Sequence, residues 1–174
     1  MVVDPVKGSV PCDPPSLTLT KIADPQTCVK TAGGFECSYK VSVASDGPDP
    51  FHGDLGIQET LPPGSSVAKV SNGWTCTPSG PAVLCKHAFV DIPVGQSLDM
   101  AITLFVPDAN VKPGACAIAN QAALAPDFGP QQGKRYVASA AATIDSPLCR
   151  QPAQQCPGDL RLEGAQCKCP EHTT

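Results

Sequence analysis

Clusters of proline and glycine recur along this chain at intervals that suit short strands and exclude long helices. The 174 residues contain 20 prolines and 15 glycines. Proline removes a backbone donor and clashes inside a helix, and glycine weakens helices through its backbone entropy. The turn sequences are Ala32-Gly33-Gly34, Asp46-Gly47-Pro48, Pro62-Pro63-Gly64, Pro78-Ser79-Gly80, Pro93-Val94-Gly95 and Gly129-Pro130. Turn signals at this frequency predict an all-β sandwich or barrel.

Between the turns, apolar and polar residues alternate with the period of a half-buried strand. The alternation is clearest over residues 35–44 and is repeated over residues 98–106. Shorter strands are expected at residues 16–22, 54–59, 66–76, 82–87, 116–124 and 136–144. Propensity alone would also allow helices in the alanine-rich stretches 115–125 and 138–142. We expect strands there because those stretches carry or adjoin β-branched and aromatic residues and lack good helix caps.

Ten cysteines in a chain of this length indicate an oxidising compartment, because reduced cytosolic proteins rarely carry so many. Aromatic residues make up only 5% of the chain, so the core is thin and disulfides supplement it. Spacing favours pairing Cys28 with Cys37 and Cys76 with Cys85. Cys116 opens the penultimate strand and Cys149 ends the last, so antiparallel pairing of these two strands would bring Cys116 to Cys149. The remaining cysteines, Cys12, Cys156, Cys167 and Cys169, are expected to fasten the C-terminal tail to the N-terminal segment.

The composition divides the chain into an N-terminal segment (1–15), a β-sandwich domain (16–145) and a cysteine-rich tail (146–174). The tail has almost no apolar surface, so its order must come from cross-links or from a partner. The N-terminus lacks a basic region followed by an apolar one. Two explanations stay open: Met1 begins a mature fragment, or the protein leaves the cell without a signal, for example in a virus particle.

Charge and hydropathy exclude several partners. The formal net charge is −4 and no run of lysine or arginine occurs, so the chain has no electrostatic footprint for nucleic acid. Apolar stretches end well before the roughly 20 residues that a membrane helix needs. An extracellular or cell-surface location is expected, with the periplasm and outer envelope left open.

In their order along the chain, several segments resemble the tandem-repeat domain of bacterial surface and secreted proteins, a domain of unknown function with an immunoglobulin-like fold. The segments are residues 17–25, 32–34 with 39–43, 46–48, 57–64, 93–97 and 119–122. The resemblance implies an immunoglobulin-like antiparallel β-sandwich. The tail, residues 156–170, is similar to short cysteine-rich units of some alphaproteobacterial envelope proteins.

The chain departs from that family at three points. Ser45-Asp46 stands where an asparagine is usual, Glu59 stands where an aspartate is usual, and the cysteines are denser. These departures leave no basis for a metal-stabilised loop.

The possible metal-ligating and catalytic residues each have a simpler interpretation. Zinc ligation by the tail's Cys156, Cys167, Cys169 and His172 competes with disulfide formation, and the Cys-x-Cys spacing is not the usual knuckle. An acidic turn with Asp46, Asp49 and Asp54 matches no calcium loop with defined ligand positions. Neither the other histidines, His52 and His87, nor the serines lie in a catalytic motif. We therefore predict no metal, cofactor or catalytic residues.

The functional prediction is a non-enzymatic structural or interaction module of an extracellular assembly: a surface repeat, or a filament or layer subunit. Its partner would be protein, through self-association or neighbouring repeats. One alternative is a glycan or cell-wall binding module that uses an exposed Trp74, Phe51 or Phe89. For Trp74 we favour packing in the core beside Cys76. A second alternative is a virion decoration protein.

Overall fold

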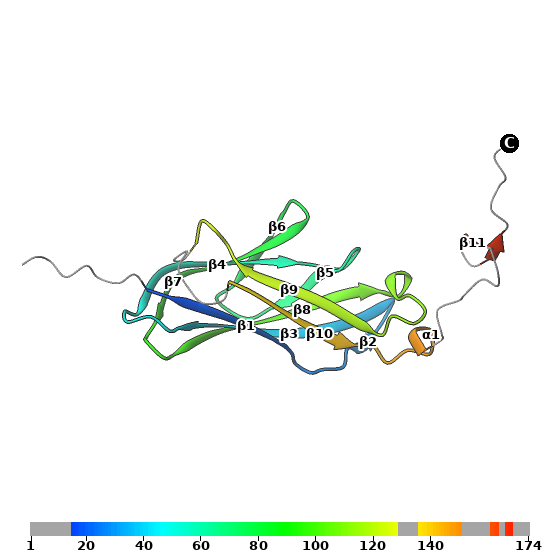
Figure 1. Cartoon of the computed structure of the whole chain (residues 1–174), viewed down its shortest axis with the longest axis horizontal. Coiled ribbons are helices and arrows are strands. Elements are labelled where there is room, and N and C mark those ends of the chain that lie inside the picture. The colour runs from blue at the N-terminus through cyan, green and yellow to red at the C-terminus, as the bar shows by residue number, and fades with distance from the viewer. Residues whose placement is uncertain (1–14, 129–135, 151–160, 164–165, 169–174) are drawn as a thin grey trace, which may run out of the picture.

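The computed structural model describes residues 15–128, 136–150, 161–163 and 166–168. Within this part, two antiparallel sheets pack face to face as an immunoglobulin-like sandwich (Figure 1). The segments with alternating apolar and polar residues therefore fold as the predicted antiparallel β-sandwich. Short elements follow or interrupt the strands: a 3-10 turn (Asp108–Asn110), helix α1 (Pro147–Arg150) and a hairpin of β11 (Arg161–Glu163) with β12 (Gln166–Lys168).

The first sheet has the strand order β1-β3-β8-β5, with β2 paired to β3. Its strands are β1 (Leu17–Ala23), β2 (Val29–Thr31), β3 (Gly34–Ser45), β5 (Ser66–Val70) and β8 (Ser97–Pro107). The two clearest sequence patterns, residues 35–44 and 98–106, are β3 and β8, which pair at the centre of this sheet.

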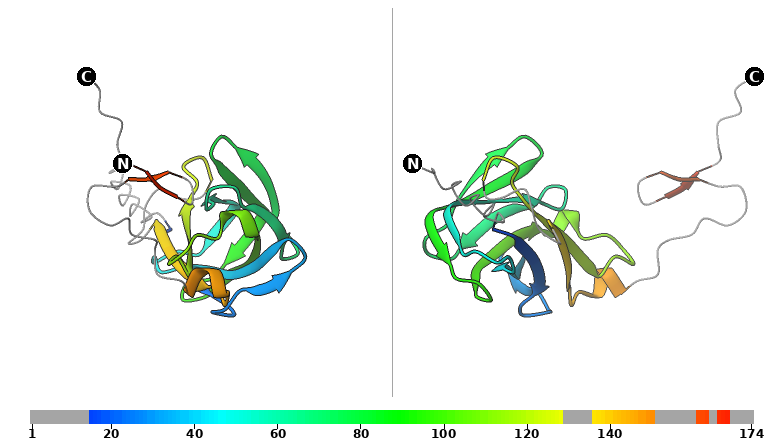
Figure 2. Two further views of the ribbon diagram at one scale, coloured as in Figure 1. Left: turned by 90° about the vertical axis from the view of Figure 1, so that its right-hand side faces the viewer. Right: turned by 60° about the vertical axis from the view of Figure 1, so that its left-hand side comes forward.

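The second sheet has the order β10-β9-β4-β7-β6. Its strands are β4 (Phe51–Thr60), β6 (Thr75–Ser79), β7 (Ala82–Ile92), β9 (Ala117–Leu124) and β10 (Val137–Thr143). The alanine-rich stretches are β9 and β10, as the sequence predicts. Views along and oblique to the long axis show the two layers (Figure 2).

The prediction of one strand over residues 66–76 is wrong. β5 belongs to the first sheet and β6 to the second, so the chain crosses between the layers here. A turn at residues 71–74 makes the crossing, with the Trp74 amide donating to the Ser71 carbonyl and Gly73 at φ +85°. A positive φ of this kind favours glycine.

The core lies between the sheets and is built mainly from aliphatic side chains. On β3, the inward residues Cys37, Tyr39, Val41 and Val43 alternate with partly exposed neighbours. They pack with a larger set from β1, β4, β7 and β8: Leu17, Leu19, Leu55, Ile57, Ile92, Met100, Ile102, Leu104 and Val106.

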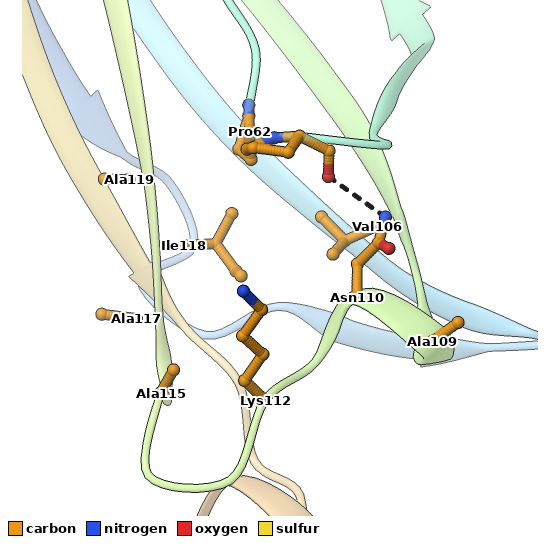
Figure 3. Close-up of a pocket in the computed structure, with 10 residues that line it drawn as sticks. Pro62, Val106, Ala109, Asn110, Lys112, Ala115, Ala117, Ile118 and Ala119 are labelled. Atoms are coloured by element: carbon orange, nitrogen blue, oxygen red, sulfur yellow. Dashed lines mark hydrogen bonds between the residues drawn. The ribbon is translucent and has the colours of Figure 1, made fainter. Parts of the chain in front are cut away.

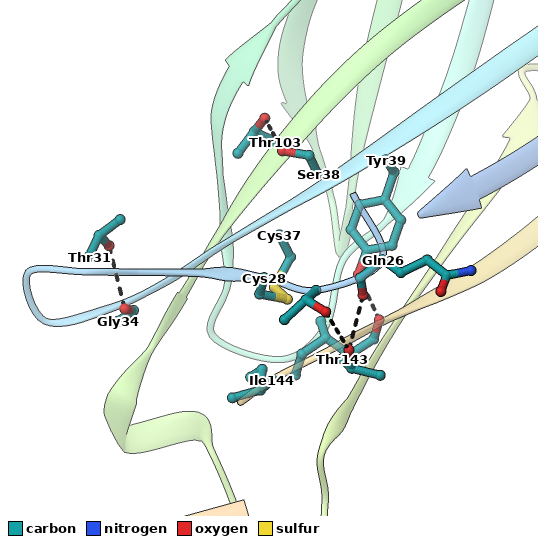
Figure 4. The surroundings of a disulfide bond; sticks show 12 residues. Gln26, Cys28, Thr31, Gly34, Cys37, Ser38, Tyr39, Thr103, Thr143 and Ile144 are labelled. Atoms are coloured by element: carbon teal, nitrogen blue, oxygen red, sulfur yellow. Dashed lines mark hydrogen bonds between the residues drawn. A yellow bond between two sulfur atoms is a disulfide. The ribbon is translucent and has the colours of Figure 1, made fainter. Parts of the chain in front are cut away.

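One edge of the sandwich is closed by contacts between the sheets. β1 and β10, blue and orange in Figures 1 and 2, lie side by side. The segment after β1 extends this contact: the Thr143 amide donates to the Gln26 carbonyl, and the Cys28 amide donates to the Thr143 carbonyl, at 2.7 and 2.8 Å (Figure 4). The first and last strands of the sandwich are therefore neighbours.

Three disulfides join described cysteines: Cys28–Cys37, Cys76–Cys85 and Cys116–Cys149. These are the three pairs that the sequence predicts. The first joins the segment before β2 to β3 (Figure 4), and the second joins β6 to β7. In the third, Cys149 lies in α1 rather than at the end of the last strand. The side chains of Cys12, Cys156, Cys167, Cys169 and His172 lie outside the described residues.

Gly34 marks the tightest backbone approach in the first sheet. A Cβ added there would lie 2.4 Å from the Val106 carbonyl oxygen and 2.8 Å from the Phe105 ring. Because this carbonyl belongs to the backbone of the paired strand, it cannot move aside without a substantial cost in free energy. We expect Gly34→Ala to lower the free energy of unfolding by about 1–3 kcal/mol, measured by denaturant titration. An unchanged midpoint would contradict this packing.

Candidate functional site

Three polar side chains occupy inward positions that the strand pattern otherwise fills with aliphatic residues. Lys21 follows Leu17 and Leu19 on the buried face of β1. Glu59 and Asn120 take the corresponding positions on β4 and β9. The exposed fractions of the three residues are 7%, 0% and 2%. Fully buried lysine and glutamate are rare in proteins unless they are paired, so this cluster is the main departure from an ordinary core.

The three side chains meet at one carboxyl group. Lys21 Nζ donates to Glu59 Oε2 at 2.7 Å and to Oε1 at 2.9 Å. Asn120 Nδ2 donates to the same Oε2 at 2.9 Å. The amine of Lys21 and the amide of Asn120 thus donate to the same oxygen. The cluster joins the two sheets, because β1 lies in the first sheet while β4 and β9 lie in the second.

Burial shifts both ionisable groups toward their neutral forms. Desolvation lowers the pKa of the Lys21 amine, although the neighbouring Glu59 acts in the opposite direction. Desolvation likewise raises the pKa of Glu59, against the opposing effects of Lys21 and Asn120. A proton transfer from the ammonium to the carboxylate therefore costs less here than in water. The product is a neutral amine, which is nucleophilic, beside a protonated carboxyl group.

The side chain of Asn120 is only partly hydrogen-bonded. Its Oδ1 is buried and has no hydrogen-bond partner among the described residues. An unsatisfied buried acceptor costs about 1–3 kcal/mol. Rotation of the amide about its Cβ–Cγ bond exchanges Oδ1 and Nδ2, which brings the carbonyl oxygen to a protonated Glu59. A hydrogen bond donated to that oxygen would polarise the amide carbonyl.

Tyr39 covers the cluster from β3 and helps to keep water out. The Lys21 Nζ lies 5.2 Å from the centroid of its ring. The Tyr39 hydroxyl donates to the Ile118 carbonyl at 2.6 Å, which fixes the ring against β9. Burial raises the pKa of Tyr39 to about 12, so the hydroxyl stays protonated. Tyr39 is therefore a packing and positioning residue and not an acid or base.

Strand register explains why this sequence forms the cluster. Lys21 pairs with Val41 on β3, and Asn120 pairs with Ala140 on β10. Glu59 pairs with Ala122 on β9, next to Asn120 on the same face. Small alanines on β9 and β10 leave room for long polar side chains. The signal was present in the sequence as single polar residues at period-two core positions, but the spacing along the chain does not show that the three converge.

The other residues that the sequence analysis considered do not form a site together. Phe51 and Trp74 are buried in the core, and Trp74 meets His87 edge to face with ring centroids 5.4 Å apart. Phe89 is 90% exposed and has a φ of +51°. Of the three proposed aromatic platforms, one remains accessible, and a single ring carries no proposal of a glycan site.

The acidic turn is also explained by local contacts. Asp46 accepts hydrogen bonds from the hydroxyls of Ser16 and Thr18, and Asp54 accepts one from the Phe89 amide. His52 lies 3.1 Å from Asp91 on the surface. In the part of the chain that the structure describes, no group of three His, Cys, Asp or Glu side chains is arranged to hold a metal ion.

A hollow near the start of β9 offers little chemistry. Figure 3 shows its lining, which is mostly alanine, proline and branched aliphatic side chains, with Lys112 as the charged member. Asn110 closes one side by donating to the Pro63 carbonyl at 3.1 Å. The Lys21–Glu59–Asn120 cluster is therefore the candidate site.

Comparisons with known proteins identify no family for this chain. No protein-family model matches the chain, and no curated protein sequence matches it significantly. Among solved structures, the chain is similar to a non-cellulosomal cohesin from Archaeoglobus fulgidus, at 12% identity and a TM-score of 0.43 over 74% of this chain and 92% of that one.

Two further similar structures come from bacteria. The major pilin SpaD of Corynebacterium diphtheriae matches at 10% identity and a TM-score of 0.42 over 73% of this chain and 33% of that one. A chitin-binding domain from Streptomyces coelicolor matches at 19% identity and a TM-score of 0.37 over 53% and 82%. At these scores, the likenesses carry no argument about function. Separately, no helix in the described residues is long and apolar enough to cross a membrane.

Proposed function

We propose that this chain is a structural module of an extracellular assembly, and that it strengthens itself by forming an amide bond between Lys21 and Asn120. The observation that carries the proposal is the buried cluster in which Lys21 and Asn120 contact one oxygen of Glu59. The module is not an enzyme, since its own side chains are the reactants and each molecule reacts once.

The proposed reaction balances without any cofactor. The Lys21 Nζ lone pair attacks Cγ of Asn120, and the bond from Cγ to Nδ2 breaks. Glu59, protonated by the transfer from Lys21, donates this proton to the amide and then accepts a proton from the lysine nitrogen, so it ends as the protonated carboxyl group. Nδ2 leaves as ammonia. A desolvated lysine is an activated nucleophile, and fixing both reactants in one buried site replaces a collision in solution.

An extracellular role agrees with the disulfides and with the proposed bond. Disulfides persist in oxidising compartments. A covalent link between the two sheets adds to the thin core in the same way as the disulfides, but reductants do not cleave it. Both kinds of bond favour durability over conformational change, which suits a building block.

The mass of the folded protein tests this proposal. We expect the purified chain, after full reduction and denaturation, to weigh less than its sequence mass by one molecule of ammonia. The Glu59→Gln variant keeps a side chain of the same shape but cannot transfer the proton, so it should retain the full sequence mass. Both are measured by intact mass spectrometry.

Glu36 provides the matched control, because its carboxylate accepts a hydrogen bond from Lys69 at 2.8 Å in the exposed part of the first sheet. Glu36→Gln should lose ammonia as the wild type does. Full sequence mass in the folded wild type would overturn the proposal.

A further inference from the structure

The proposed amide bond attaches to β9 at Asn120, and one disulfide attaches at Cys116, the residue before β9. Cys116 precedes Asn120 by four positions and is bonded to Cys149. At the other end of the sandwich sequence, Lys21 is the fifth of the seven residues of β1, the first strand. A covalent route therefore leads from Lys21 to Asn120, back along the backbone to Cys116, and across to Cys149.

We infer that this route carries tension directly from the N-terminal side of the module to its C-terminal side. The inference rests on the proposed function, because the first link is the Lys21–Asn120 amide. The route bypasses nearly the whole sandwich: residues 22–115 form one closed loop beside it and residues 121–148 form another. Force applied at the two ends then passes through covalent bonds and three backbone residues, 117–119.

Without the route, the same force would act on hydrogen bonds. β1 is joined to β3 by an antiparallel ladder that runs from Leu17–Ser45 to Ala23–Tyr39. Pulling on the chain before β1 peels this strand from the sheet, and the core opens behind it. With the route in place, the peeling stops at Lys21, so only residues 17–20 of β1 can leave the sheet.

This arrangement specifies the kind of assembly that the module fits. Neighbours joined to it before β1 and after Cys149 would be linked in series, and each junction would bear the full load. A second copy of this chain, or another protein module, meets this requirement. A module that only bound a ligand on one face of the sandwich would not need a covalent route between its two ends.

Single-molecule pulling on the full chain, held by handles at both ends, tests the inference. Cys12, Cys156, Cys167 and Cys169 are replaced by serine in every sample, so that only the described disulfides remain. We expect the oxidised wild type to show no unfolding step beyond the short peeling of β1. After reduction, it should release residues 121–148 alone, a gain in contour length of roughly 100 Å before the folded span is subtracted.

Glu59→Gln is the comparison that prevents the amide from forming while it keeps the shape of the side chain. When oxidised, it should release roughly 270–290 Å, since the Cys28–Cys37 and Cys76–Cys85 loops stay closed. When reduced, it should release roughly 420–460 Å. The four lengths differ enough to be assigned without further labels.

The outcomes separate this inference from the proposed function. If the wild type has lost ammonia but still extends by hundreds of ångströms when oxidised, the bypass is wrong and the amide stands. If the wild type keeps its full mass and extends like Glu59→Gln, the proposed function fails and the bypass fails with it. A wild type that loses ammonia and resists extension supports both.

Discussion

Replacement of Glu59 by alanine is expected to bring this domain close to unfolding at room temperature. Two losses combine. The amide closes a loop of about 100 residues, which the loop-entropy estimate for cross-links values at about 4–5 kcal/mol. In the variant, Lys21 cannot form the amide and stays a buried ammonium without its carboxylate, which costs about 3–5 kcal/mol more. The total is comparable with the 5–15 kcal/mol by which most domains are stable.

Guanidinium titration followed by Trp74 fluorescence measures this effect under oxidising conditions. Glu36→Ala is the matched control, because it removes a glutamate whose salt bridge with Lys69 lies on the surface. Exposed pairs of this kind contribute about 0–1 kcal/mol. Equal midpoints for Glu59→Ala and Glu36→Ala would contradict the structural role of the cluster.

Replacement of Lys21 by methionine is expected to make the stability depend on pH. The variant cannot form the amide and leaves Glu59 buried without the cation that partly offsets its desolvation, so the pKa of Glu59 rises further. A raised folded-state pKa favours the folded protein when the carboxyl is protonated. Stability should be fully present below the unfolded pKa of about 4.3 and be lost as pH rises through the folded-state value, by about 1.4 kcal/mol for each unit of difference.

Thermal or denaturant unfolding at a series of pH values measures this dependence. The double variant Lys21→Met/Glu59→Gln removes the titrating carboxyl, so the part of the slope due to Glu59 should disappear. A Lys21→Met protein that grows more stable from pH 4 to pH 8 would contradict the assigned direction.

Much of the sandwich follows from local sequence rules, and particular strands show why. The period-two pattern over 35–44 became β3 because both its faces have distinct environments, one packed and one partly exposed. The pairs Cys28–Cys37 and Cys76–Cys85 follow from hairpin-like spacing. The 66–76 prediction failed because an alternating pattern does not record which sheet a strand joins. At the turn that contains Gly73 the chain passes from the first sheet to the second, although the alternation of apolar and polar residues is hardly interrupted.

The candidate site was harder to predict because it depends on contacts between distant residues. Lys21, Glu59 and Asn120 come from three strands, and the lysine and glutamate are 38 positions apart. Each looks like an ordinary polar residue in its own strand. Only the pairing of β4 with β9, together with the packing of β1 across the layers, brings them to one carboxyl. The burial that shifts their pKa values is likewise a property of the assembled core.

Peptide mapping of the folded wild type tests the central claim most directly. After reduction and proteolysis, tandem mass spectrometry should find a branched peptide in which the Lys21 side chain is joined to the Asn120 side chain, with ammonia lost. This result excludes cyclisation of Asn120 on its own backbone, which loses the same mass but joins no second peptide. Linear peptides that carry an unmodified Lys21 and an intact Asn120 would contradict the account.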